Sequence, residues 1–376
     1  MPASATRIAK KPRWRYLYNL CLVACPPTGV ACVVEYGHKN LQLVGRYLMM
    51  QTRKLGRTNL SIPALGLGCV TFGREIDKAS SFAVMDHAMA LGVTLFDSAE
   101  GYGGGNARQY RRKNLNVDDE REVTGEMHSS ELIVGRWLRE RKCRGRVFLC
   151  TKMLSPNQPD NIERAVGASL ERLGIDCIDL FMLHTWDDDA PIGETLDALT
   201  QQVRNGRVRC VGASNITAEQ LTESLACSEA HGYARFDAVE NNYNLSCREP
   251  EQDVLPVCGL KNVSFIAYSP LGGGFLTGKY TPDRGALPAG TRFDVLPGHC
   301  DAYFSDRNFR VVQRLRKLSE SIGQSMAHLA AAWAVTNDLV ACTLFGARKL
   351  EHLDNAVAAL NTGLDPALRT EMAEWE

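Results

Sequence analysis

Four polar side chains stand at or directly after the ends of apolar runs, and together they could donate a proton. The run 93–96 leads to Asp97 and, five residues later, to Tyr102. Two later apolar runs end in Lys152 and His184. The carboxyl ends of the strands of a parallel barrel form a single face, so we expect the four side chains to meet there.

The chemistry that this set suggests is acid catalysis by a tyrosine. A free phenol has a pKa of about 10 and is a poor acid at neutral pH. A nearby ammonium group stabilises the phenolate and lowers that pKa. Lys152 could supply the ammonium group, Asp97 could hold it charged, and His184 could orient a substrate oxygen. Tyr102 would then protonate a carbonyl oxygen while hydride reaches the carbonyl carbon. The alternative is that each residue is an ordinary polar strand end.

The composition is that of an ordinary globular protein. The 376 residues are 45% hydrophobic and 23% charged, with a net charge of zero. We therefore expect neither a nucleic acid nor a membrane as a partner. The 13 cysteines include no zinc-like pair of CxxC motifs, and we expect no metal site. Cys150 and Cys210 lie inside apolar strand patterns, as is typical of reduced thiols in a cytoplasmic protein.

A regular alternation of strands and helices begins at Pro63 and predicts an α/β fold, a closed (β/α)8 TIM barrel, within a single domain over 49–376. A short β-hairpin over 52–62 precedes it. Strands are predicted near 64–69, 93–97, 147–152, 178–184, 208–213, 237–241, 263–268 and 341–345. Helices are predicted near 78–91, 129–141, 159–173, 190–205, 217–231, 250–259, 306–335 and 350–360. A doubly wound open sheet is the alternative, although no GxGxxG motif of a Rossmann site is present.

Residues 1–48 differ from the rest of the chain. They hold seven basic residues and a single acid, Glu35. Pro26-Pro27 interrupts their apolar part, so a transmembrane helix is not expected. The segment is upstream sequence read from a start codon placed too early, a targeting leader, or a functional arm. In each case we expect it to be poorly ordered or packed apart from the barrel.

Two further segments interrupt the alternation. Residues 106–127 follow Tyr102 closely, contain five basic and five acidic residues, and show no apolar periodicity. A tolerated surface insertion is the simpler interpretation, and a gate for the substrate is the alternative. Residues 272–305 are rich in glycine and proline, and a loop of that length is usually functional or mobile.

A series of motifs makes the chain resemble the aldo-keto reductases, from about Thr52 to near the C-terminus. The resemblance is greatest to the bacterial and potassium-channel-β-like branches. In order, the motifs are Phe96-Asp97-Ser98-Ala99-Glu100-Gly101-Tyr102-Gly103, Thr151-Lys152, Asp179-Leu180-Phe181-Met182-Leu183-His184, Glu194-Thr195-Leu196-Asp197-Ala198-Leu199, Gly206-Arg207-Val208-Arg209-Cys210-Val211-Gly212-Ala213-Ser214-Asn215, Ala267-Tyr268-Ser269-Pro270-Leu271-Gly272 and Gly346-Ala347-Arg348. The resemblance implies an NADPH-dependent enzyme that reduces an aldehyde or ketone to an alcohol. It makes Tyr102 the acid, with Asp97, Lys152 and His184 as its partners.

The resemblance also implies a set of cofactor-binding residues. They are Ser214, Asn215, Glu240, Tyr268, Ser269, Pro270, Leu271, Gly272, Gly273, Lys279, Gly346, Arg348, Lys349 and His352. Ser214 and Asn215 would hydrogen-bond the nicotinamide amide of NADPH (or NADP+), and Tyr268 would stack on its ring. The segment 269–273 would pass close to the pyrophosphate. Arg348 and Lys349 would face the 2′-phosphate, an oxyanion that suits arginine.

Several residues depart from the family pattern. Glu240 stands where glutamine is usual, and a carboxylate cannot donate to the nicotinamide C=O unless it is protonated. Either the cofactor is held more weakly or the pKa of Glu240 is raised. Lys349 replaces a serine or threonine, and His352 stands where glutamine is common. The 106–127 segment separates Tyr102 from Ser130, which usually follows closely.

Two other functions stay open at this point. The first is a regulatory subunit that binds NADPH as a redox sensor with little turnover. The second is an aldolase that forms a Schiff base on Lys152, although the nearby Asp97 would keep that lysine charged. The substrate expected for the reductase is a small carbonyl compound, and the protein is expected to be a monomer or a homo-oligomer.

Overall fold

The computed structural model describes residues 20–23, 32–35 and 50–375, in two units divided between Met49 and Met50. In the first unit, β1 (Leu20–Val23) and β2 (Cys32–Glu35) form an antiparallel pair. The other expectations for 1–48 fall outside the described residues. None of the described helices is both long enough and apolar enough to cross a membrane.

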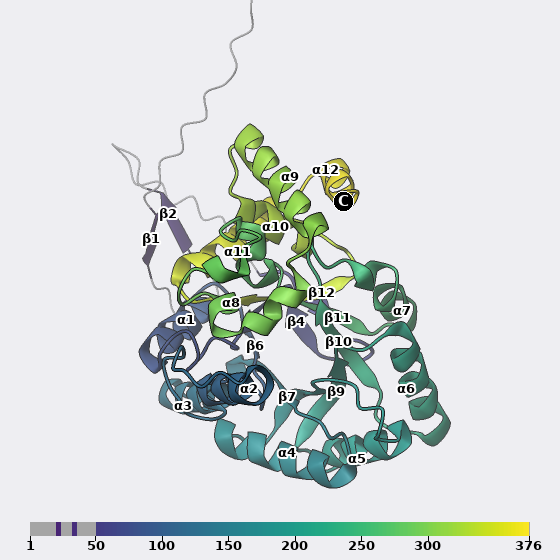
Figure 1. Ribbon diagram of the computed structural model, residues 1–376. Coiled ribbons are helices and arrows are strands. Elements are labelled where there is room, and N and C mark those ends of the chain that lie inside the picture. Colours follow the sequence, from purple (N-terminus) through teal and green to yellow (C-terminus); the bar gives the residue numbers. More distant parts are fainter. Residues whose placement is uncertain (1–19, 24–31, 36–49, 376) are drawn as a thin grey trace, which may run out of the picture. The chain divides into compact units, whose positions relative to one another are not determined.

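In the second unit, eight parallel strands close into a barrel (Figure 1). They are β5 (Leu65–Gly68), β6 (Leu95–Asp97), β7 (Phe148–Met153), β8 (Ile178–Leu183), β9 (Val208–Ser214), β10 (Phe236–Asn242), β11 (Ser264–Tyr268) and β12 (Val340–Gly346). β12 pairs with β5 and so closes the ring. The predicted (β/α)8 class is confirmed, and the open-sheet alternative is wrong.

Helices surround the strands (Figure 1). They are α1 (Lys78–Ala90), α3 (Ser129–Arg141), α4 (Pro159–Leu173), α5 (Ile192–Arg204), α6 (Ala218–His231), α7 (Val254–Lys261), α9 (Asp306–Ile322), α10 (Met326–Val335), α11 (Leu350–Thr362) and α12 (Pro366–Ala373). The predicted capping box, Thr217 with Gln220, begins α6. The single helix predicted over 306–335 is wrong, because Gly323 turns left-handed (φ 72°) and Ser325 caps a new helix.

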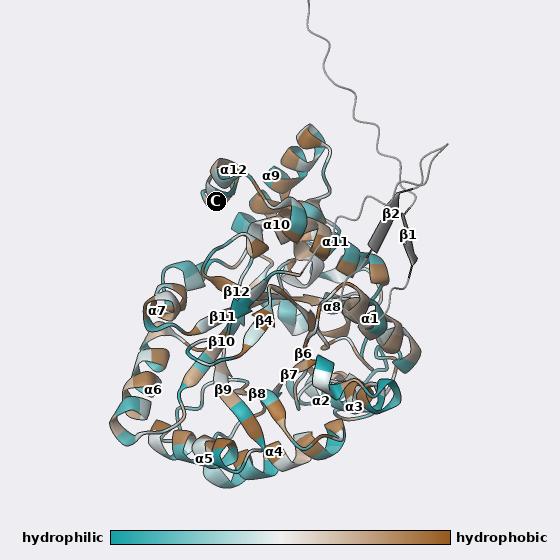
Figure 2. Cartoon of the chain, turned by 180° about the vertical axis from the view of Figure 1, so that it is seen from behind, coloured by the Kyte–Doolittle hydropathy of each residue, from teal (hydrophilic) through white to brown (hydrophobic). Residues whose placement is uncertain are grey.

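The burial pattern explains why strands and helices have different sequence periods. All six residues of β8 are buried, because helices cover the outer surface of the barrel and side chains fill its interior. Helices α4 to α6 alternate between hydrophobic and hydrophilic residues along their length (Figure 2), since only one side of each packs against the strands.

A hairpin closes the amino-terminal end of the barrel. Its strands are β3 (Thr52–Lys54) and β4 (Ser61–Pro63). The backbone N–H of Gly56 donates to Ser264 Oγ at 2.8 Å, and the Arg53 guanidinium donates to the Val340 carbonyl. Ser264 and Val340 are the first residues of β11 and β12. The predicted hairpin is confirmed, and the opposite end of the barrel is left for the site.

The two interrupting segments both contain short helices at the carboxyl ends of the strands. These are α2 (Gly104–Tyr110) with a following π-helical turn (Arg111–Leu115), and, between 272 and 305, η4 (Gly272–Thr277), η5 (Arg284–Ala286), α8 (Arg292–Val295) and η6 (Pro297–Ala302). The 106–127 segment thus has helical structure that its lack of apolar periodicity did not indicate. α2 is too short to show an apolar period, and charged side chains hold the segment in place.

Candidate active site

Strand register brings Asp97 and Lys152 together. Asp97 ends β6 and lies opposite Cys150 of β7, and Lys152 follows two residues later on the same face. The Lys152 ammonium group donates to Asp97 and, at 3.2 Å, to the carbonyl of Ser98. The exposed fractions of Asp97 and Lys152 are 2% and 0%, so this ion pair is shielded from water.

Tyr102 and His184 stand next to this ion pair. The Lys152 Nζ atom lies 5.1 Å from the centroid of the Tyr102 ring. The rings of Tyr102 and His184 meet edge to face with centroids 5.4 Å apart. The structure thus brings the four predicted residues together. Ser130 also returns to Tyr102 despite the insertion, because its backbone N–H donates to the Tyr102 carbonyl at 3.4 Å.

The predicted direction of the Tyr102 pKa shift is wrong. Burial raises the pKa of the Tyr102 phenol, and the charge of Lys152 opposes this effect without overcoming it. The phenol therefore keeps its proton at neutral pH. It can still donate a proton to the substrate oxygen. Hydride addition turns the carbonyl group into an alkoxide, and the corresponding alcohol is about as weak an acid as water, whose pKa is about 15.7.

His184 is a neutral group in this environment. Burial lowers its pKa to about 3, and the positive charge of Lys152 acts in the same direction. Its Nδ1 atom has no hydrogen-bond partner among the described residues. A neutral imidazole offers one donor and one acceptor. His184 can therefore hydrogen-bond a substrate oxygen without competing with Tyr102 as the acid.

Lys152 remains an ammonium group. Burial alone would lower its pKa, but the negative charge of Asp97, the larger opposing cause, and the neighbouring Glu240 carboxyl group outweigh burial, and the pKa is raised well above the usual value. Glu240 Oε1 lies 3.2 Å from Lys152 Nζ. A Schiff base requires an uncharged amine, so the geometry disfavours the aldolase alternative.

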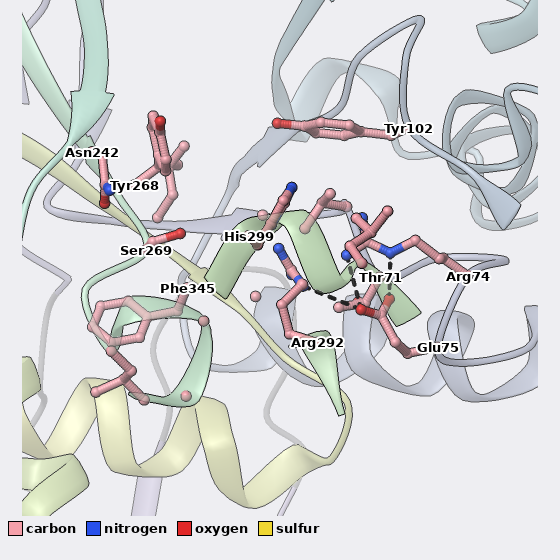
Figure 3. Close-up of a pocket in the computed structure, with 18 of the residues that line it drawn as sticks. Thr71, Arg74, Glu75, Tyr102, Asn242, Tyr268, Ser269, Arg292, His299 and Phe345 are labelled. Atoms are coloured by element: carbon pink, nitrogen blue, oxygen red, sulfur yellow. Dashed lines mark hydrogen bonds and ion pairs between the residues drawn. The ribbon is translucent and has the colours of Figure 1, made fainter. Parts of the chain in front are cut away.

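A cavity of about 860 Å³ opens above these residues (Figure 3). Its walls include Asp97, Tyr102 and His184, together with most of the predicted cofactor residues, namely Ser214, Asn215, Glu240, Tyr268, Ser269, Pro270, Leu271, Gly273, Lys279, Gly346, Arg348 and His352. Three predicted residues are not in its walls. Lys152 lies buried beneath them, Gly272 packs against Tyr303, and the 71% exposed side chain of Lys349 pairs with Glu351.

Hydrogen bonds make one wall of the cavity rigid. The hydroxyl of Ser214 donates to the carbonyl of Glu240 at 2.7 Å. The Asn215 side-chain amide donates to the His184 carbonyl at 2.9 Å, and its oxygen accepts from the Tyr268 hydroxyl at 2.7 Å. These hydrogen bonds therefore hold the carboxyl ends of four neighbouring strands, β8 to β11, in place beside Tyr102.

The other end of the cavity is cationic. Burial, with a smaller contribution from the charges of Arg348 and Arg292, lowers the pKa of Lys279 to about 8. Arg292 and Arg74 share one acid, Glu75, at 3.2 Å and 2.8 Å (Figure 3). Crowded, partly buried cations favour an anionic ligand, and phosphate groups fit them well.

Our sequence interpretation missed Arg74, Glu75 and Arg292. The first two follow the carboxyl end of β5 by six and seven residues, a position that could have identified them as candidates for the site. Arg292 begins α8 inside the long 272–305 loop, where neither strand order nor periodicity gives a signal.

The 106–127 segment forms part of the cavity wall. Arg111 is fully buried and pairs with Asp119 at 3.0 Å and with Glu122. Its guanidinium group also donates to the carbonyl of Val295 at 2.9 Å, which ties the segment to the 272–305 loop. Tyr110, the residue before Arg111, lies in the cavity wall. The surface-insertion interpretation does not account for these contacts.

Comparison with known proteins identifies the class to which this fold and site belong. Residues 64–375 match the model of the Aldo/keto reductase family, so the chain belongs to that family. It is an NAD(P)H-dependent oxidoreductase.

Relatives in fungi and bacteria match over almost their whole lengths. The chain is 29% identical to the aldo-keto reductase yakc [NADP(+)] of Schizosaccharomyces pombe, over 87% of this chain and 92% of that protein. It is 30% identical to protein tas of Escherichia coli, over 86% and 96%, respectively. It is 29% identical to the oxidoreductase YrpG of Bacillus subtilis, over 84% and 93%.

Proposed function

We propose that this protein reduces an aldehyde or ketone to an alcohol with NADPH, and that Tyr102 donates the proton. The observation that carries the proposal is the buried ion pair of Asp97 and Lys152 beneath Tyr102, with neutral His184 beside it, at one wall of a large cavity. NADPH, when bound, supplies the hydride. The residues of this chain supply the proton and position the substrate.

The proton moves from the Tyr102 hydroxyl to the substrate oxygen. As its O–H bond breaks, negative charge develops on the phenol oxygen, and the buried Lys152 ammonium group stabilises that charge. Asp97 keeps Lys152 charged and oriented. His184 donates a hydrogen bond to the same substrate oxygen, which aligns the carbonyl group with the Tyr102 hydroxyl.

The cavity suits the two ends of the cofactor differently. Ser214, Asn215 and Tyr268 form the wall beside Tyr102, where the nicotinamide would bind. The cationic end contains Lys279 and Arg348, which would hold the phosphates. The NADP(+) in the name of the fission yeast relative supports this preference. Lys349 is left out of the proposal, since its ammonium group is at the surface.

The substrate we propose is a small carbonyl compound, bound between Tyr102 and the cavity wall that Tyr110 and Leu296 contribute. A cytoplasmic location fits the chain best, because the ten cysteines from Cys69 to Cys342 are all free thiols.

The test is NADPH oxidation by the full chain against a panel of small aldehydes and ketones, with NADPH binding measured in parallel by fluorescence. The proposal expects tight binding and turnover of at least one class of carbonyl compound. Binding without any turnover would favour the regulatory, cofactor-sensing alternative. Absence of NADPH binding would contradict both functions.

A further inference from the structure

Glu240 is a second acid beside Lys152, the lysine that pairs with Asp97. Its side chain is 2% exposed, and its Oε1 atom lies 3.2 Å from Lys152 Nζ. Its Oε2 atom is buried and has no hydrogen-bond partner among the described residues. Glu240 also lines the cavity beside Tyr102 and Tyr268. The proposed mechanism does not use it.

The charges around Glu240 do not balance if both acids are ionised. The titratable groups that face it are Asp97 from β6, Tyr102 from the following loop, Cys150 and Lys152 from β7, Tyr268 from β11 and Cys342 from β12. Lys152 is the cation among them, and its ammonium group donates to Asp97. Oxygens of Asp97 and Glu240 and the sulfur of Cys150 lie within 4.8 Å of one another. Two carboxylates this close oppose each other's ionisation.

Contact with Lys152, and not burial, decides which acid keeps a proton, because burial raises the pKa of both. Burial and the charge of Asp97 together raise the pKa of Glu240 to about 8, against the opposing effect of Lys152. Asp97 accepts a hydrogen bond from Lys152, and this contact orients the lysine. At neutral pH the cluster therefore consists of ionised Asp97, the Lys152 ammonium group and a protonated Glu240.

We propose that Glu240 binds the nicotinamide amide as a carboxylic acid, and that the cofactor is released when Glu240 ionises. A protonated carboxyl group offers an O–H donor and a C=O acceptor, which match the C=O and NH₂ of an amide. A carboxylate offers acceptors alone and would leave the amide C=O without a partner. The unpartnered Oε2 atom is the position from which the donor acts. This inference rests on the cofactor site of the proposed function.

The test is the pH dependence of the NADPH dissociation constant between pH 7 and pH 9.5. Lys279 has a pKa of about 8 and would contribute its own loss of affinity. Both proteins therefore carry Lys279→Arg, which stays charged throughout. One keeps Glu240 and the other carries Glu240→Gln, which retains a donor and an acceptor but has no proton to lose.

With Glu240 present, and a pKa of about 8, affinity should fall roughly 30-fold by pH 9.5. With Glu240→Gln it should change by no more than about twofold. Equal losses in the two proteins would overturn the inference. If NADPH binds to neither protein at pH 7, the proposed cofactor site itself is wrong, and the inference falls with it.

A second measurement does not depend on the folding of Glu240→Gln. Calorimetry of NADPH binding to Lys279→Arg at pH 9, in two buffers with different ionisation enthalpies, counts the protons taken up. The inference expects an uptake of about 0.9 proton, because about nine-tenths of Glu240 is ionised one pH unit above its pKa. Binding without proton uptake would contradict it.

Discussion

Replacing Arg111 with methionine should release the 106–127 segment from the cavity. Arg111 is fully buried, and the substitution would leave the Glu122 side chain, 2% exposed, without its cation. Removing one partner of a buried ion pair costs about 3–5 kcal/mol. The contacts of Arg111 join the segment to Val295 and not to a barrel strand. The lost free energy should therefore destabilise the closed position of the segment. Each 1.4 kcal/mol is a factor of ten, so opening should increase about 10²- to 4 × 10³-fold.

Limited proteolysis followed by mass spectrometry measures this opening directly. The rate of cleavage within 106–127 should rise with the open population, since the closed segment protects its own backbone. Arg112→Met is the matched control. The Arg112 side chain is 60% exposed and makes an ion pair with Asp118 at 3.1 Å, and exposed pairs contribute about 0–1 kcal/mol. Equal cleavage rates in the two variants would refute our account of Arg111.

Three further predictions concern the site. Asp97→Asn should lower kcat of NADPH-dependent reduction about 10²-fold or more, because Lys152 loses the acid that orients it; an unchanged kcat would contradict this. Arg348→Ser should weaken NADPH binding about 10- to 100-fold and leave NADH binding unchanged, since only NADPH carries the 2′-phosphate; an equal loss for both would argue against that contact. His184, with its pKa lowered to about 3, is neutral above that pH and should add no ionisation to kcat/KM between pH 5 and pH 8. A change in kcat/KM near pH 6.5 that is absent in His184→Gln would contradict the assignment of His184 as a neutral group.

Much of the barrel could be predicted because its signals are local. Apolar runs between helical patterns identified all eight strands, and the Thr217 cap marked the start of α6. The break between α9 and α10 was missed because the apolar pattern continues across Gly323, whose left-handed backbone ends the first helix. The short helix α2 was missed because its buried residues, Gly104, Gly105 and Ala107, form no apolar stripe, and the buried residue of the turn after it is the charged Arg111.

The positions of the active-site residues were easier to predict than their ionisation. Asp97, Lys152 and His184 mark strand ends, and strand ends converge in a parallel barrel. The pKa of Tyr102 depends on burial by distant loops as well as on Lys152, and sequence spacing does not reveal that burial. Glu240 shows the same contrast. Its position follows from the order of the strands, but whether it keeps its proton depends on the side chains of other strands.

The most direct test of the central claim compares the wild type with Tyr102→Phe, using NADPH that carries deuterium at both C4 positions. Mass spectrometry of the product alcohol follows the transfer to carbon, and NADPH fluorescence reports binding. We predict that the wild type places one deuterium on the carbinol carbon. Tyr102→Phe should bind NADPH with similar affinity but turn over about 10²- to 10⁴-fold more slowly, because the proton donor is missing. Undiminished deuteride transfer by Tyr102→Phe would contradict the account.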